Sequence, residues 1–173
     1  MTVTNWCIIT GAPRSGKTKI IERLAYCGYR TCPEIARLLI DDYNSNDSIE
    51  KCDFSTPLFE DIIFRTKVTA ETNFCKDETV FFDRSPIDSI AFARLYNRPY
   101  KEYVDKITLG YKKVFLMAHL DSYISDYATM ENEQQSEKLT GLLIDAYQFF
   151  GYQLIKVPKM SIRDRVKFIE EMI

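Results

Sequence analysis

Residues 11–18 read Gly-Ala-Pro-Arg-Ser-Gly-Lys-Thr and match the pattern G-x-x-x-x-G-K-[ST]. The glycines let several backbone N–H groups converge on one anion at the start of a helix, where the helix dipole also favours negative charge. In this pattern the lysine, here Lys17, reaches the β- and γ-phosphates, and the hydroxyl of Thr18 binds Mg2+. The segment is predicted to be a phosphate-binding loop whose nucleotide contacts come from Gly11, Ala12, Pro13, Arg14, Ser15, Gly16, Lys17 and Thr18.

A second group of charged residues directly follows the apolar run 79–82. Asp83 and Arg84 would lie at the carboxyl end of a strand, which is where open α/β sheets bind ligands. Asp83 is predicted to bind Mg2+ or to accept a proton from a substrate hydroxyl, and Arg84 to hold phosphate with its planar guanidinium group. The alternative is a surface turn with an aspartate helix cap and a solvated arginine.

A third group follows a short strand that ends near Cys32. Glu34 and Arg37 are spaced i, i+3 and would share one helix face at the same edge of the sheet. A carboxylate beside a guanidinium group suits a hydroxylated or anionic acceptor, and Glu34 is a candidate for orienting the acceptor hydroxyl. A solvated ion pair worth less than about 0.5 kcal/mol is the other interpretation, and both stay open.

Helices and loops after these strands are expected to build the pocket for the acceptor, here residues 44–59 and 85–98. Asp88 and Arg94 are therefore predicted to contact it. Arg94 and Arg98 are spaced i, i+4 on a predicted helix after Asp88, and the alternative for this pair is a solvated helix face.

The order of apolar runs indicates how these groups are positioned. Strand-like runs alternate with segments of helical period, with no repeat and no Pro/Ser-rich linker, which predicts one α/β domain over residues 1–173 with a mostly parallel sheet. Two stretches without clear period, 44–55 and 120–132, are predicted to be loops. Both are candidates for lids, and 120–132 is the predicted lid segment of the domain. Strands are predicted at 6–10, 29–32, 79–83, 114–117 and 152–157. Helices are predicted over 19–27, 57–74, 139–150 and 162–169.

Composition excludes several classes of protein. The 173 residues carry 23 Lys and Arg against 25 Asp and Glu, so no bulk charge attracts nucleic acid or an anionic membrane. No apolar run is long enough to span a membrane, and the first residues lack a leader pattern, which predicts a cytoplasmic protein. The 5 cysteines form no Cys-x-x-Cys pair and His119 is the single histidine, so spacing predicts neither a disulfide framework nor a zinc site.

Four blocks in this order carry a family resemblance: the loop at 11–18, Pro-Glu-Ile-Ala-Arg at 33–37, Phe-Phe-Asp-Arg-Ser-Pro-Ile-Asp at 81–88, and the stretch 142–158. Together they resemble the family of small P-loop ATPases that includes the ribosylnicotinamide kinase domain. The resemblance covers nearly the whole chain. It implies a three-layer α/β fold of nucleotide-kinase type, with about five parallel strands, helices on both faces and the phosphate-binding loop on a central strand.

The resemblance also implies ATP and Mg2+ as ligands and phosphoryl transfer to a small hydroxylated acceptor. By resemblance, the loop residues Gly11, Gly16, Lys17 and Thr18, the pair Asp83 and Arg84, and the acceptor-side pair Glu34 and Arg37 carry over, and Pro158 is expected to lie by the adenine. The catalytic residues are then predicted to be Lys17, Asp83, Arg84 and Glu34, with Thr18 and Asp83 as the predicted metal ligands.

One block departs from the pattern. Related sequences read Asp-x-x-Arg-x-Glu in the lid, whereas residues 126–131 place Thr129 where the arginine would fall. Loss of such an arginine costs about 10³ to 10⁵ in rate, so turnover is an open question. Arg14, Arg94 or Arg98 are candidates to replace it.

Three functions are compatible with these residues. The leading hypothesis is a kinase of a small nucleoside- or nucleotide-like acceptor. The alternative is a nucleotide-binding switch, regulated by a protein partner, that turns over slowly or not at all. A polynucleotide 5′-hydroxyl kinase is less favoured, because it needs a basic groove for the strand. The sequence indicates neither the acceptor nor the oligomeric state.

Overall fold

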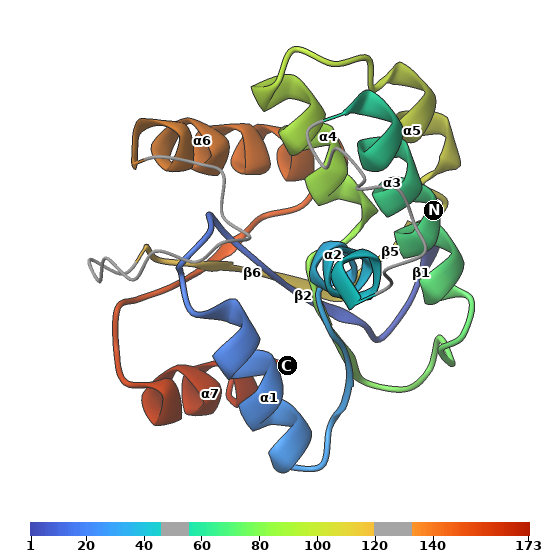
Figure 1. The fold of residues 1–173 in the computed structure, drawn as a ribbon. Coiled ribbons are helices and arrows are strands. Elements are labelled where there is room, and N and C mark those ends of the chain that lie inside the picture. The colour runs from blue at the N-terminus through green and yellow to red at the C-terminus, as the bar shows by residue number, and fades with distance from the viewer. Residues whose placement is uncertain (46–55, 120–132) are drawn as a thin grey trace.

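The computed structural model describes residues 1–45, 56–119 and 133–173, and its centre is a five-stranded parallel sheet (Figure 1). The strand order is β3 (Arg30–Cys32), β4 (Val80–Asp83), β2 (Cys7–Thr10), β6 (Lys113–Met117) and β7 (Ile155–Val157). β2 is therefore central, between β4 and β6. This confirms the predicted fold class and places the carboxyl ends of β2, β3 and β4 together.

Helices cover both faces of the sheet (Figure 1). One face carries α1 (Lys17–Tyr26) and α7 (Ile162–Glu170), and the other carries α3 (Pro57–Glu71), α4 (Pro86–Leu95), α5 (Lys101–Lys106) and α6 (Glu133–Phe149). α2 (Ile35–Ser45) packs beside α3. No helix within residues 1–45, 56–119 and 133–173 is long and apolar enough to cross a membrane.

Two hydrophobic cores follow from the alternation of side chains along the strands. Ile8 and Phe82 pack into the core under α4 and α6, while Ile9, Phe81 and Phe115 pack into the core under α1 and α7. Because strands buried on both faces read as continuous apolar runs, the central strands were recognisable from sequence. The parallel pair β1 (Thr2–Val3) and β5 (Leu109–Gly110) was missed, since two residues per strand show no period.

Two local predictions are wrong. α4 ends at Leu95, because Asn97 adopts a left-handed φ of 55° and the N–H of Arg98 donates to the carbonyl of Ala93 at 2.7 Å. Arg94 and Arg98 therefore do not share a helix. The loop predicted at 44–55 starts too early, since α2 continues to Ser45. The rest of that loop and the predicted lid at 120–132 lie outside the described residues.

Candidate nucleotide-binding site

The phosphate-binding loop leaves β2 with an unusual backbone. Gly11 has φ 143°, Arg14 has φ 62° and Gly16 has φ 82°, so the chain turns sharply before α1 begins at Lys17. Gly16 occupies the N-cap position and has no side chain to accept from the first N–H groups of α1. These N–H groups and the positive end of the helix dipole are thus available to an anion.

Gly11 is a position in this loop where a side chain has no room. A Cβ atom there would lie 2.9 Å from the carbonyl oxygen of Met117 and 3.1 Å from Oγ of Ser15. We expect Gly11→Ala to distort the loop, lower stability by about 1–3 kcal/mol and weaken binding of the ATP analogue AMP-PNP. Calorimetric titration and thermal unfolding measure both effects.

The matched control is Gly141→Ala on α6, where the added Cβ would meet no other atom of the described residues within 4 Å, apart from its chain neighbours and the backbone of the same helix. Because alanine favours a helix over glycine, this change should raise stability by about 0.5–1 kcal/mol and leave AMP-PNP binding unchanged. Equal AMP-PNP affinity in Gly11→Ala and the unmodified protein would contradict the assignment of the loop.

Lys17 lies beneath the loop with only 5% of its surface exposed. Its Nζ donates to the carbonyl of Ala12 at 2.9 Å and to Oγ of Ser15 at 3.3 Å. Burial, and next the positive charge of Arg84, lower the pKa of Lys17 to about 8. An anionic ligand would stabilise the charged ammonium group, because its oxygens accept hydrogen bonds in place of the water that burial has removed.

Thr18 and Asp83 lie together at the ends of the loop and of β4. Thr18 Oγ1 donates to Asp83 Oδ2 at 3.2 Å. The other carboxyl oxygen, Oδ1, is buried and has no hydrogen-bond partner among the described residues. Burial, and next the charge of Glu34, raise the pKa of Asp83 to about 6. A hydroxyl beside an unsatisfied carboxylate oxygen fits the hard oxygen ligands that Mg2+ prefers.

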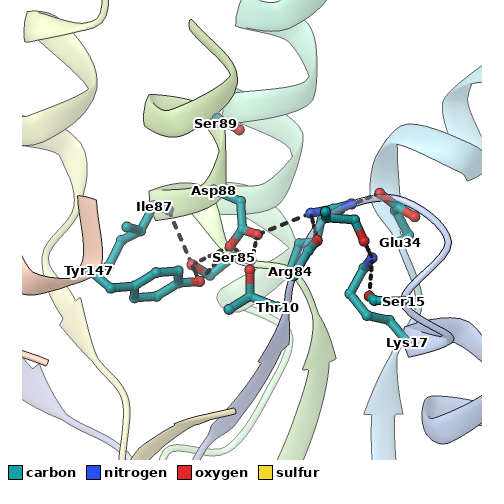
Figure 2. A network of polar contacts seen from close by, with 12 residues as sticks. Thr10, Ser15, Lys17, Glu34, Arg84, Ser85, Ile87, Asp88, Ser89 and Tyr147 are labelled. Atoms are coloured by element: carbon teal, nitrogen blue, oxygen red, sulfur yellow. Dashed lines mark hydrogen bonds and ion pairs between the residues drawn. The ribbon is translucent and has the colours of Figure 1, made fainter. Parts of the chain in front are cut away.

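Arg84 joins three parts of the site (Figure 2). Its Nε donates to Glu34 Oε1 at 2.6 Å, and its Nη1 donates to the carbonyl of Gly11 at 3.0 Å and to Asp88 Oδ1 at 3.4 Å. The residue is buried with φ 69°, and its N–H donates to the carbonyl of Ile9 at 3.0 Å. The solvated arginine considered as an alternative is wrong. With these contacts made, Arg84 holds the loop and Glu34 in position.

Glu34 lies just before α2, and its carbonyl accepts from the N–H of Leu38 at 3.2 Å. Its carboxylate points toward Arg84 rather than along the helix (Figure 2). Burial by itself would raise the pKa of Glu34, but Arg84 and then Lys17 lower it to about 2. Glu34 is therefore an anion at neutral pH. Arg37, predicted beside it, lies half-buried within α2.

Asp88 lies beneath the site and is fully buried. Oδ1 accepts from Thr10 Oγ1 at 2.6 Å, while Oδ2 accepts from the N–H of Ser85 at 2.9 Å and from the hydroxyl of Tyr147 at 2.5 Å. The carboxylate thus caps α4 and also faces Arg84. Both oxygens thus accept hydrogen bonds from within the protein, and the contact of Asp88 with an acceptor stays a prediction.

Comparison with known proteins agrees with this geometry. A family model described as AAA domain matches residues 6–165. The chain belongs to the AAA domain family. No curated protein matches it.

Solved structures similar to this AAA domain include nucleoside and nucleotide kinases and the NadR protein. A deoxyadenosine kinase from M. mycoides with bound dCMP is 15% identical, with 96% of this chain and 97% of that chain covered and a TM-score of 0.67. The NadR protein in complex with NAD and AMP-PNP is 16% identical, with 97% and 49% covered and a TM-score of 0.70. Thymidylate kinase from Candida albicans is 12% identical, with 96% and 89% covered and a TM-score of 0.61. The chain thus spans about half the length of the NadR protein, and at these identities the likeness shows the fold.

The AAA domain does not bring every predicted residue to the loop. Arg94 lies in the last turn of α4, eight residues or about 12 Å along the helix from Pro86, and pairs with Asp145 at 3.3 Å. Arg98 lies beyond α4 and pairs with Glu60 at 3.7 Å. Arg14 stays in the loop, and its buried Nε has no partner among the described residues.

At the other edge of the AAA domain, Pro158 is exposed and directly follows β7. Arg165, in the next helix, was not predicted. It is 2% exposed and its Nη1 donates to the carbonyl of Ser15 at 2.8 Å, so α7 supports the loop from below. The sequence did contain an indication that Arg165 is buried. It follows Ile162 by three residues and precedes Ile169 by four, so it lies on the apolar stripe of α7.

Proposed function

We propose that this chain binds ATP with Mg2+ and transfers the γ-phosphoryl group to a hydroxyl of a small nucleoside-like acceptor. One observation carries the proposal: Lys17, the pair of Thr18 and Asp83, and the pair of Arg84 and Glu34 all meet where β2 and β4 end. The fold supports it, since it is that of nucleoside and nucleotide kinases, and solved relatives bind AMP-PNP and dCMP.

In this proposal the backbone N–H groups of the loop bind the phosphates of ATP. Lys17 exchanges its contacts with Ala12 and Ser15 for oxygens of the β- and γ-phosphates. Thr18 and Asp83 would hold Mg2+, which neutralises charge on those phosphates. Arg84 stays bound to Gly11 and keeps the loop in register with Glu34.

The acceptor hydroxyl donates a hydrogen bond to Glu34. The oxygen of that hydroxyl attacks the γ-phosphorus, the bond from that phosphorus to the oxygen that bridges to the β-phosphate breaks, and ADP leaves with that oxygen. The hydroxyl proton passes to an oxygen of the transferred phosphoryl group as the new bond forms. A carboxylate with a pKa of about 2 is a weak base, so Glu34 contributes by orienting the hydroxyl. Positioning of this kind is the main demand of phosphoryl transfer.

Removal of one carboxylate tests the metal site. We expect Mg2+ to tighten AMP-PNP binding to the unmodified chain, and Asp83→Asn to reduce that gain about tenfold or more, because the buried Oδ1 is no longer anionic. Calorimetric titration with and without Mg2+ measures the gain. Asp77→Asn, an exposed aspartate, is the control. The full Mg2+ effect in Asp83→Asn would contradict the assignment.

The function itself is tested by ADP release from Mg-ATP, alone and with nucleosides, nucleotides and a 5′-hydroxyl oligonucleotide. Stimulation by a nucleoside or nucleotide that disappears in Lys17→Ala supports the kinase. ATP binding without stimulation by any of them contradicts it and favours a nucleotide-binding switch. Stimulation by the oligonucleotide alone favours a polynucleotide kinase.

A further inference from the structure

Arg165 is a buried cation without a counter-charge in the described part of the chain. Its side chain is 2% exposed, and its Nη1 donates to the carbonyl of Ser15 at 2.8 Å. Nε and Nη2 are also buried, and neither has an acceptor among the described residues. A guanidinium group stays charged at all ordinary pH values, and a buried charge without a partner is costly. An anionic ligand bound nearby would offset this cost.

The one hydrogen bond that Arg165 makes leads to the phosphate-binding loop. α7 packs beside α1 on one face of the sheet, and Arg165 reaches from there to a residue 150 positions earlier in the sequence (Figure 1). Ser15 is fully buried, and its hydroxyl oxygen accepts from Lys17 Nζ at 3.3 Å. Two cations therefore hold Ser15, Lys17 through the side chain and Arg165 through the backbone.

The bond from Arg165 fixes the direction of the peptide group between Ser15 and Gly16. The peptide bonds of the loop 11–18 are trans, so the C=O and the N–H of this group point in opposite directions. Because the carbonyl faces α7, the N–H of Gly16 faces the side of the loop away from α7. Among the described residues, no backbone carbonyl accepts from this N–H. Gly16 is partly exposed, so its N–H is available to an anion.

Buried cations hold other carbonyl groups of the loop in the same way. Two such bonds are made, to Gly11 by Arg84 Nη1 at 3.0 Å and to Ala12 by Lys17 Nζ at 2.9 Å. A carbonyl that turned toward a bound phosphate would place an acceptor where a donor is needed and would repel the anion. Arg165 prevents this turn at Ser15.

We propose that Arg165 is a positioning residue for nucleotide binding: it holds the carbonyl of Ser15 so that the N–H of Gly16 donates to a phosphate oxygen, and the bound phosphates offset its buried charge. This inference rests on the proposed function, which assigns phosphate to the loop. It does not depend on the acceptor or on phosphoryl transfer. Arg165 thus recognises the phosphate chain of the nucleotide rather than its base.

Calorimetric titration with Mg-AMP-PNP and with inorganic tripolyphosphate tests this role. Arg165→Met has no charge and no donor, so it should weaken both ligands about tenfold or more. Arg165→Lys keeps the charge and one donor, which suffices for a single bond to a carbonyl, and should bind both within about threefold of the unmodified chain. Equal affinities in Arg165→Met and the unmodified chain would overturn the inference. Weaker binding of AMP-PNP alone would also overturn it, because Arg165 would then act on the base.

The matched control is Lys167→Met on the same helix. Lys167 is exposed and pairs with Glu171 at 3.7 Å, so its loss should leave both affinities unchanged. Thermal unfolding verifies that each variant folds. Arg165→Gln, which is shorter and uncharged, covers the case that Arg165→Met does not fold, and it should weaken both ligands in the same way.

Nuclear magnetic resonance can follow this one peptide group. The pair Ser-Gly occurs once in the sequence, at 15–16, so 13C-carbonyl serine with 15N glycine gives a single correlation in protein made by cell-free synthesis. AMP-PNP should move the Gly16 amide proton downfield in the unmodified chain and in Arg165→Lys, because a hydrogen bond to an anionic oxygen is strong. In Arg165→Met the Ser15 carbonyl should shift before nucleotide is added, and the downfield movement should be smaller. The same two signals in Arg165→Met and the unmodified chain would overturn the inference.

The inference and the proposed function fail in different ways. If the variants lose AMP-PNP affinity but no acceptor stimulates ADP release from the unmodified chain, the role of Arg165 is supported and the kinase is contradicted. If an acceptor does stimulate release and the KM for ATP is the same in Arg165→Met, the kinase stands and the role of Arg165 is overturned. Absence of AMP-PNP binding to the unmodified chain would overturn both.

Discussion

Lys17→Met should lower kcat/KM for acceptor-stimulated phosphoryl transfer at least a hundredfold. Lys17 is the buried cation beneath the loop, held by Ala12 and Ser15, and no other lysine lies in the loop segment 11–18. Without Lys17 the protein would no longer place its main positive charge beside the transferred phosphoryl group. The loss of one preorganised donor typically lowers the rate by about 10² to 10³. Steady-state release of ADP measures the effect.

The control for this change is Lys19→Met. Lys19 lies two residues further along α1, is exposed and pairs with Glu22 at 2.9 Å, so its loss should leave kcat/KM within about twofold. Thermal unfolding of both variants verifies that the fold is retained. A Lys17→Met variant that keeps more than a tenth of the activity would show that the loop is not the catalytic phosphate site.

Local chemistry explains which features the sequence predicted well. The phosphate-binding loop is encoded within eight consecutive residues, because glycines and their φ angles act on their own stretch of chain. The central strands were equally readable, since burial on both faces leaves a continuous apolar run such as 79–82. The central position of the strand before the loop came from the family resemblance, because apolar runs alone do not specify their neighbours, and the full strand order was not predicted.

Partners that are distant in sequence explain what was missed. Arg84 binds Glu34, 50 residues away, and Gly11, 73 residues away, so its role as a connector follows only from the folded chain. The same holds for Asp88. It accepts a hydrogen bond from Tyr147, which lies 59 residues away in the sequence and on another helix. Spacing alone predicted that both residues contact a ligand, and those contacts stay predictions.

Charged residues on apolar helix faces carried a signal that went unused. Lys67 and Glu71 lie with Phe59, Ile63 and Phe64 on the buried face of α3. A lysine and a glutamate on such a stripe are rarely buried without a partner or a function. The sequence could therefore have indicated that these two side chains of α3 are buried. It could not have indicated that they lie beside the carboxyl ends of β3 and β4.

Glu34→Gln is expected to separate nucleotide binding from phosphoryl transfer. The carboxylate meets Arg84 at 2.6 Å and lies where β3 and β4 end, whereas the nucleotide contacts that we propose come from residues 11–18. An amide orients a hydroxyl less strongly than an anion does, so kcat should fall about 10²-fold or more. AMP-PNP affinity should stay within about threefold. Single-turnover kinetics and calorimetric titration measure the two quantities.

Arg84 supplies the complementary test of the same pair. Arg84 also binds Gly11 and Asp88, so Arg84→Met should weaken nucleotide binding and stability as well as transfer. Arg84→Met removes one hydrogen-bond donor from the buried carboxylate of Asp88. We therefore expect the free energy of unfolding to fall by about 3 kcal/mol or more. Glu34→Gln keeps those other contacts, and its loss of transfer without loss of AMP-PNP binding would assign Glu34 to the acceptor. If both variants lost AMP-PNP binding equally, Glu34 would act through the loop rather than on the acceptor hydroxyl.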